Sequence, residues 1–404
     1  MVLSLLMSPH MFRRNERPAR KRRIFTAGVA LLLSASLFVS TACAPRTEDG
    51  RLPGGLKGRT QNVILLIGDG LSVAAVSAAR LRKGGAEGRL HMDRMPVAGF
   101  VRTTAANDLI TDSAAAATAM ASGFKTNNGM IGMTPDGRKV LSIMKAAMDR
   151  GMAAGLVATS SITHATPAAF AAHVPSRNME TEIAANFISA GVNLLFGGGR
   201  RFFLPETPDG GKRDDGRNLL QEARAAGYDV CLTPKEAAAA ESRKILGLFA
   251  HGAMDMTASD ISLADMTSLA IEKLRGRGRG FFLMVEGSQI DWEAHDNIPD
   301  RMIEEILDFD EAAGRALDFA AKDRRTLVIA TSDHETGGLV ILDGTPDGGE
   351  IEVAWASTGH TGATVPLTAF GPGAEAISGF RDNTEIALAL ARRLGIRDFP
   401  RHLD

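Results

Sequence analysis

The feature that most constrains the fold is a series of short, continuous apolar runs separated by amphipathic segments. Such a run predicts a strand covered on both faces, and parallel sheets are covered in this way by the helices that connect their strands. The chain is therefore predicted to be α/β, with a doubly wound, mostly parallel central sheet and helices on both faces. The predicted strands are 62–67, 154–159, 192–196, 228–233, 281–286 and 326–331. The predicted helices include 139–150, 262–274, 301–322 and 384–394, and the Gly-, Asp- and Arg-rich segment 198–260 is predicted to be peripheral.

Residues 1–44 have the features of an export signal. They contain seven basic residues, one acid and the apolar run AGVALLLSASLFV. A basic start, a short apolar centre and small residues after it are typical of a signal rather than of a membrane span. The stretch KRRIFTAG resembles a twin-arginine signal. TACAP then offers two outcomes, cleavage after Ala44 or acylation of Cys43 as a lipoprotein site, and the first is favoured.

The rest of the chain is predicted to be a linker over residues 45–60 and one domain over residues 61–404. Of the 404 residues, 45% are hydrophobic and 23% charged, which is ordinary globular composition. The net charge of −1 becomes about −7 once the leader, with its seven basic residues and one acid, is removed. That balance does not indicate nucleic-acid binding. Removal or acylation of Cys43 leaves Cys231 alone, so no intrachain disulfide is expected.

Carboxylates occur at the ends of three predicted strands. Asp69, Glu286 and Asp333 each stand at a strand end or within two residues of it. Because the carboxyl ends of parallel strands share one edge of a sheet, and ligands bind there, we expect these side chains to converge. Carboxylates gathered in one cleft repel each other unless a cation holds them.

Histidines accompany these carboxylates. Asp291 and His295 are four residues apart and would share one helix face, His334 follows Asp333, and His360 lies in STGHTG. Each alone is more simply explained as a cap, a turn residue or a surface group. Together, carboxylates and imidazoles without a thiolate suit catalytic zinc, and a carboxylate–hydroxyl site suits magnesium. Four other histidines fit no metal spacing and are predicted to be structural or surface groups: His91, His173, His251 and His402.

Six motifs together resemble those of the alkaline phosphatases, in the order of that family. They are VILLIGDG, TDSAAAATAMASG, THATPAAFAAHVPSR, VEGSQIDWEAH, TSDHETGG and STGHTG, and the resemblance covers roughly residues 60–395. It implies an exported homodimeric enzyme, periplasmic or extracellular, that hydrolyses phosphate monoesters through a phosphoserine. It also implies two zinc ions and one magnesium ion.

The resemblance further implies a role for each motif residue. Ser113, alone only the cap of an alanine-rich helix, would be the nucleophile and contact metal, and Arg177 would bind the phosphate. The implied metal ligands are Asp291, His295 and His360 for the first zinc, Asp69, Asp333 and His334 for the second, and Asp69, Thr166 and Glu286 for magnesium. From the residues alone, Thr166 also fits a helix N-cap followed by proline, and Arg177 fits an ordinary surface arginine.

Two positions depart from the family's common pattern. Many bacterial members carry Asp where this chain has His164, and Lys where it has Trp292. These changes remove one negative and one positive charge. We therefore predict a weaker or altered third metal site, open to zinc because imidazole is a softer ligand, and weaker binding of product phosphate.

Two other functions are compatible with the same core. The first is phosphodiester hydrolysis or phosphate transfer, and the second is a metal-dependent envelope or binding protein without catalysis. Ser113 and Arg177 favour a dianionic monoester over a diester. Together with the complete ligand set, they also argue against a non-catalytic protein.

Overall fold

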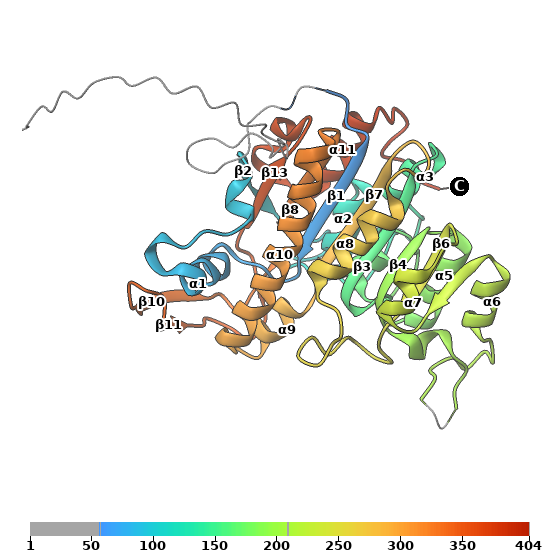
Figure 1. The fold of residues 1–404 in the computed structure, drawn as a ribbon, viewed down its shortest axis with the longest axis horizontal. Coiled ribbons are helices and arrows are strands. Elements are labelled where there is room, and N and C mark those ends of the chain that lie inside the picture. The colour runs from blue at the N-terminus through green and yellow to red at the C-terminus, as the bar shows by residue number, and fades with distance from the viewer. Residues whose placement is uncertain (1–55, 57, 208–209, 404) are drawn as a thin grey trace, which may run out of the picture. The chain divides into compact units, whose positions relative to one another are not determined.

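The computed structural model describes residues 56, 58–207 and 210–403 (Figure 1). The predicted signal, Cys43 and most of the predicted linker lie outside the described residues. Of the helices within the described ranges, none is both long enough and apolar enough to cross a bilayer.

A ten-stranded sheet forms the centre of the fold, in the order β14-β2-β13-β8-β1-β7-β3-β4-β6-β5. Within this sheet only β13 runs against the other strands. The predicted α/β fold with a mostly parallel sheet is confirmed. The ten strands are β1 (Asn62–Gly68), β2 (Val97–Arg102), β3 (Ala153–Ser161), β4 (Leu194–Gly198), β5 (Tyr228–Cys231), β6 (Lys244–Leu248), β7 (Phe281–Gly287), β8 (Thr326–Ser332), β13 (Val365–Phe370) and β14 (Gly379–Asp382).

The six predicted strands are all present, and four strands of the sheet were not predicted. The segment 198–260 is not merely peripheral, because it supplies β5 and β6 at one edge of the sheet. At the other edge, β2 and β13 alternate buried with more exposed residues, and β14 has no buried residue, so these three strands lack a continuous apolar run. Two small antiparallel pairs lie outside the sheet, β9 (Glu335–Thr336) with β12 (His360–Thr361), and β10 (Val340–Gly344) with β11 (Ile351–Ala354).

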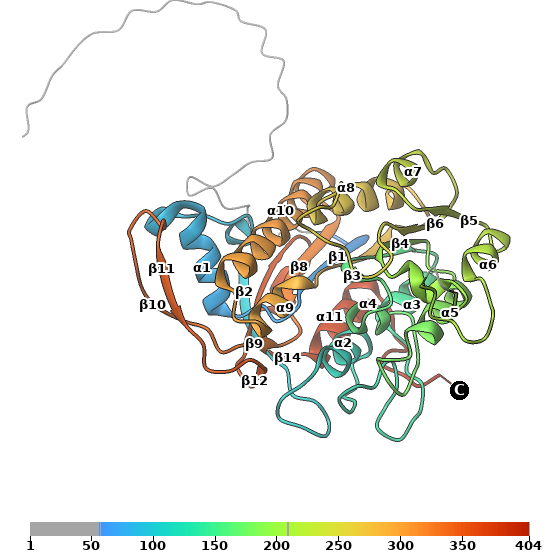
Figure 2. The same ribbon diagram turned by 90° about the horizontal axis from the view of Figure 1, so that it is seen from below.

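The helices lie on both faces of the sheet (Figure 2). The predicted helix 139–150 begins only at Ile143, because Ser142 caps it by accepting a hydrogen bond from the Lys145 N–H. The helices are α1 (Val73–Gly84), α2 (Ser113–Ser122), α3 (Ile143–Asp149), α4 (Ala165–Ala168), α5 (Glu180–Ala190), α6 (Leu219–Ala225), α7 (Pro234–Ala239), α8 (Leu263–Leu274), α9 (Gln289–His295), α10 (Pro299–Asp323) and α11 (Thr384–Leu394).

Strand β1 divides the core into two layers because its side chains alternate between the faces of the sheet. Val63, Leu65 and Ile67 belong to the layer that includes α2, α3 and α11. Ile64 and Leu66 belong to the layer that includes α8 and α10. The strand is fully buried, as its unbroken apolar sequence predicts.

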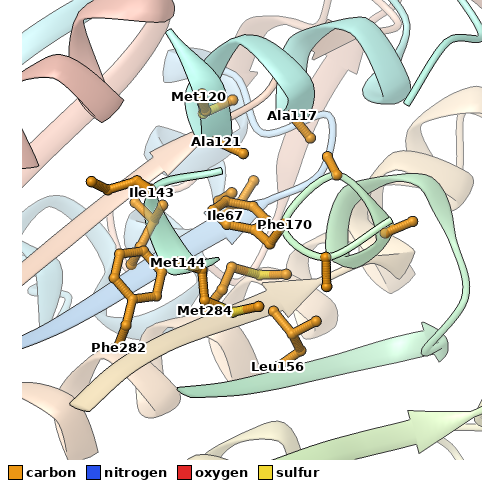
Figure 3. Close-up of a cluster of buried hydrophobic side chains, with 14 of the residues drawn as sticks. Ile67, Ala117, Met120, Ala121, Ile143, Met144, Leu156, Phe170, Phe282 and Met284 are labelled. Carbon is orange, nitrogen blue, oxygen red and sulfur yellow. The ribbon is translucent and has the colours of Figure 1, made fainter. Parts of the chain in front are cut away.

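Helix α2 is buried along its whole length and packs against α4 and α11. Figure 3 shows its residues Ala117, Met120 and Ala121 on the same side-chain cluster as Ile67 and Phe170. Larger side chains than alanine would not fit between these neighbours without moving them, because protein interiors are close-packed. The alanine-rich sequence therefore allows the first residue of α2 to reach the carboxyl edge of the sheet.

Candidate active site

Three buried carboxylates gather at the carboxyl ends of adjacent strands. Asp69 follows β1, and Asp333 follows β8. Glu286 is the second-to-last residue of β7 and lies opposite Ile67 of β1. The neighbours of β1 are β8 and β7, so all three side chains meet at one place, as the strand pattern predicts. All three residues are 0% exposed.

Several oxygens of this group lack any hydrogen-bond partner. They are both carboxylate oxygens of Asp69, Oε1 of Glu286, Oδ2 of Asp333 and Oγ1 of Thr166. Burial and the neighbouring carboxylates raise the pKa of Asp69 well above its ordinary value, and burial raises the pKa of Glu286 to about 7. Buried, unpaired oxygens of this kind are strongly unfavourable unless they bind cations, so the donor set fits a metal centre.

Asp291, His295 and His360 form a first donor group. Helix α9 presents Asp291 and His295 on one face, and β12 brings His360 to them. The two Nε2 atoms are 3.1 Å apart, and they lie 3.3 Å and 3.6 Å from Oδ1 of Asp291. Donors bound to one zinc at about 2.0–2.2 Å in tetrahedral geometry are roughly 3.3–3.6 Å apart, so these spacings fit one ion.

Carbonyl groups set the orientation of both imidazoles in this group. Nδ1 of His295 donates to the Thr358 carbonyl at 2.6 Å, and Nδ1 of His360 donates to the Thr111 carbonyl at 2.8 Å. Because a carbonyl only accepts, each neutral ring directs the lone pair of Nε2 into the site. Asp291 raises the pKa of His295 to about 9, and a bound cation would take the place of that proton.

His334 organises a second donor group. Its Nε2 atom is 3.3 Å from Oδ1 of Asp69 and 3.3 Å from Oδ2 of Asp333. Asp291 also belongs to this group, since its carboxylate lies within 4.8 Å of the donors of Asp69 and His334. Thr336 donates to Asp291 at 2.5 Å and accepts from Nδ1 of His334 at 3.3 Å, which again leaves Nε2 facing the site. Burial lowers the pKa of His334, which favours its neutral, ligating form.

A third donor group contains Asp69, Glu286 and His164. The prediction that Thr166 caps helix α4 is wrong, because the helix begins at Ala165, two residues before Pro167, with His164 at the cap position. Thr166 is then inside the first turn, where its hydroxyl is buried and has no partner. A hydroxyl left in this state beside two carboxylates fits a magnesium ligand.

Ser113 is the first residue of α2 and not its cap, so the interpretation of Ser113 as a helix cap is wrong. Asp112 caps the helix by accepting from the Ala115 N–H at 2.9 Å. The Ser113 hydroxyl is 3.2 Å from Nε2 of His334 and is therefore beside the second donor group. Free backbone N–H groups and the positive end of the helix dipole meet at this end of α2, and both favour an anion on Ser113.

Arg177 connects the helix cap to the third donor group. Its Nη1 atom donates to Asp112 at 3.1 Å, and its Nη2 atom donates to Nε2 of His164 at 3.1 Å. Burial and then Arg177 lower the pKa of His164 to about 3, so this imidazole is neutral. Trp292 lies edge-on against His164, with ring centroids 6.1 Å apart.

Two residues that support the site were not predicted from the sequence. Asp112 holds Arg177, and Thr336 sets the tautomer of His334. The sequence feature that could have indicated them is proximity to a predicted site residue, since Asp112 precedes Ser113 and Thr336 lies two residues after His334. The four histidines predicted to be structural lie away from the three donor groups, and His173 and His251 are hydrogen-bonded to the carbonyls of Val140 and Gly210. The prediction that His91 fits no metal spacing is wrong, because its ring lies within 4.8 Å of carboxylate oxygens of Asp310 and Glu311, although Lys83 already pairs with both carboxylates.

Comparison with known proteins gives one consistent family. A family model described as alkaline phosphatase matches residues 60–350. Alkaline phosphatase 3 of Bacillus subtilis is 36% identical, with 88% of this chain and 94% of that protein covered. Streptomycin-6-phosphate phosphatase of Streptomyces griseus is also 36% identical, with 91% and 97% covered.

A solved structure agrees with these matches. Alkaline phosphatase from the Antarctic bacterium TAB5 superimposes with a TM-score of 0.77 at 36% identity, over 84% of this chain and 99% of that one. A mutant of the TAB5 enzyme in which a histidine is replaced by aspartate has Mg bound in the M3 site.

Proposed function

The chain belongs to the alkaline phosphatase family and is a phosphomonoester hydrolase, and we propose that it acts through a phosphoserine formed on Ser113. We further propose two zinc ions and one magnesium ion at the three donor groups. The observation that carries both proposals is the convergence of buried, partnerless carboxylate oxygens beside a serine at a helix N-terminus.

The ligand sets follow the chemistry of the donors. Asp291, His295 and His360 would hold one zinc, and Asp69, Asp333 and His334 would hold the other. Asp69, Thr166 and Glu286 would hold magnesium. When bound, such ions neutralise phosphate charge and stabilise the attacking and leaving oxygens of an in-line displacement.

The residues of the chain supply the reacting oxygen and position the substrate. The Ser113 oxygen would attack phosphorus, so that an Oγ–P bond forms as the ester P–O bond breaks and the alcohol leaves. Water would then attack the phosphoserine, which releases inorganic phosphate and restores Ser113. Arg177, held by Asp112, would present its planar guanidinium to two phosphate oxygens, while the N-terminus of α2 favours the negative charge.

Arg177 provides the test that separates a monoesterase from a diesterase. We expect wild-type enzyme to prefer an aryl monophosphate over a bis-aryl phosphate. Arg177→Gln should lower kcat/KM for the monoester by about 10- to 100-fold, because it removes charge-assisted hydrogen bonds to a dianion. The diester, with less charge, should lose less. Arg315→Gln, at an exposed position on α10, is the matched control and should change neither value. A larger loss for the diester would contradict the proposal.

His164 and Trp292 are proposed to weaken the magnesium site and the binding of product phosphate. His164→Asp adds a carboxylate beside Asp69 and Glu286. We expect magnesium to bind about tenfold more tightly, because one added charged ligand contributes about the free energy of a tenfold change in affinity. The magnesium-bound mutant of the TAB5 relative, which also replaces a histidine with aspartate, supports this expectation.

Trp292→Lys tests the second half of this proposal. A lysine beside His164 adds positive charge near the phosphate position, so inhibition by inorganic phosphate should become several-fold stronger. Magnesium binding measured by calorimetry, together with phosphate inhibition constants, checks both variants. Unchanged values in both would reject a modulating role for these residues.

Localisation and assembly are also proposals. The leader supports export to the periplasm or beyond, where the enzyme would release phosphate for uptake. Cleavage after Ala44 or acylation of Cys43 would decide whether it is released or lipid-anchored. The family supports a homodimer of residues 61–404.

A further inference from the structure

Six arginines line two grooves at the amino edge of the central sheet, opposite the edge that holds the candidate site. The grooves are neighbours, since Gln61 and Arg325 line both. We call this surface the arginine face, and its arginines are Arg59, Arg150, Arg275, Arg279, Arg324 and Arg325. We propose that the arginine face binds the anionic headgroups of a phospholipid membrane.

The parallel sheet itself gathers these side chains. Arg59 precedes β1, Arg150 precedes β3, Arg279 precedes β7, and Arg325 precedes β8. These four strands are adjacent, in the order β8-β1-β7-β3. The arginines therefore converge at the amino ends of the same strands whose carboxyl ends carry Asp69, Glu286 and Asp333 or lead to α4.

Helix capping explains only part of this cluster. Arg150, Arg275 and Arg324 follow the C-termini of α3, α8 and α10, where a cation interacts favourably with the helix dipole. Arg59 and Arg279 end no helix, yet they line the same groove. The face therefore concentrates more positive charge than the helix ends account for.

The charge of the face is largely unneutralised within the described residues. Asp323 is the one acid among the residues that line the two grooves, and it is 3.6 Å from Arg325. Arg150, Arg279 and Arg324 are exposed and form no ion pair with a described acid. Because the mature chain carries a net charge of about −7, this face is oppositely charged to the molecule as a whole. Such a patch favours a polyanionic surface as its partner.

The position of the face in the chain favours a membrane over another polyanion. Gly58 and Arg59 line the groove, so the chain upstream is joined to the domain on this face. The apolar leader and Cys43 lie within that upstream sequence. About 15 residues separate Cys43 from Arg59 and span at most roughly 50 Å, so a membrane-held leader keeps the face near the bilayer.

The arrangement also suits the proposed export of the enzyme, on which this inference rests. Strands of seven to nine residues separate the two edges of the sheet by roughly 25 Å, so the candidate site would face away from the bilayer. One acyl chain alone gives only marginal membrane binding, and a basic patch is the second signal that makes it stable. Headgroup binding by the arginine face would therefore supply the second signal when Cys43 is acylated, and the whole of the attraction when the chain is cleaved after Ala44.

Vesicle binding by metal-loaded enzyme recovered after export, once its basic leader has been processed, tests the proposal. Two triple variants make the same change in charge: Arg150→Gln with Arg279→Gln and Arg324→Gln on the arginine face, and Arg89→Gln with Arg224→Gln and Arg315→Gln outside both grooves. Each protein is sedimented with vesicles of phosphatidylcholine alone and with 30% phosphatidylglycerol. The ratio of the two affinities cancels any contribution from an acyl chain on Cys43.

We expect wild-type enzyme and the control variant to prefer the phosphatidylglycerol vesicles by tenfold or more at low salt, and to lose this preference at about 0.5 M NaCl. The arginine-face variant should lose at least about tenfold of that preference. Equal loss in both triple variants, a preference that survives high salt, or tighter binding to duplex DNA than to the anionic vesicles would overturn the proposal. Equal turnover of an aryl monophosphate by all three proteins shows that they are folded and separates this test from the proposed chemistry.

Discussion

Replacing Ser113 with alanine is expected to lower kcat for an aryl monophosphate by on the order of 1000-fold or more, because the oxygen that would carry the phosphoryl group is removed. The metal content should not change, since the three donor groups remain complete without the hydroxyl. Helix α2 should also remain folded, because Asp112 rather than Ser113 caps it.

Two measurements besides turnover make the Ser113 prediction specific. Phosphate trapped on the protein at low pH should be found in the wild type and be absent from Ser113→Ala, while elemental analysis finds the same metals in both. Ser122→Ala is the matched control, since Ser122 is a buried serine at the other end of α2 that bonds only within its own segment. Near wild-type turnover by Ser113→Ala would refute a serine nucleophile.

Replacing Glu286 with glutamine is expected to stabilise the metal-free protein and to abolish magnesium binding. Burial raises the pKa of Glu286 to about 7, above its ordinary value of 4.5. In the metal-free protein the ionised side chain therefore destabilises the fold, by an amount that grows as the pH rises from about 4.5 to about 7. Glu286→Gln should then stabilise the metal-free protein by about 3 kcal/mol at pH 8 and by less than about 1 kcal/mol at pH 5.

In the presence of metal, Glu286→Gln should impair the protein instead of stabilising it. Glutamine lacks the charge that would hold magnesium, so magnesium binding and the activation it gives should be lost. Glu305→Gln is the control, because Glu305 on α10 is also buried and burial also raises its pKa to about 7. Glu305→Gln should stabilise the metal-free protein similarly without changing its magnesium binding. Denaturant unfolding of chelated protein and calorimetric titration with magnesium check the pair, and identical magnesium binding in both variants would contradict the assignment.

Much of the candidate site could be predicted because it follows from local rules. Asp69 and Asp333 end apolar strands, and the carboxyl ends of parallel strands share one edge whatever the rest of the chain does. Asp291 and His295 share a face of α9 because of their spacing alone. The edge strands β2, β13 and β14 could not be found in this way, since partly exposed strands lack a continuous apolar run.

The sequence by itself determined the class of fold, the strand-end carboxylates and the serine at the start of α2, because each depends on residues that are neighbours in the chain. Only the tertiary structure decided which groups complete the site. The contact of Arg177 with Asp112, the approach of His360 to His295, and the exposed arginine face all join segments far apart in sequence. Such contacts depend on packing and on strand order, and neither is encoded in the spacing of neighbouring residues.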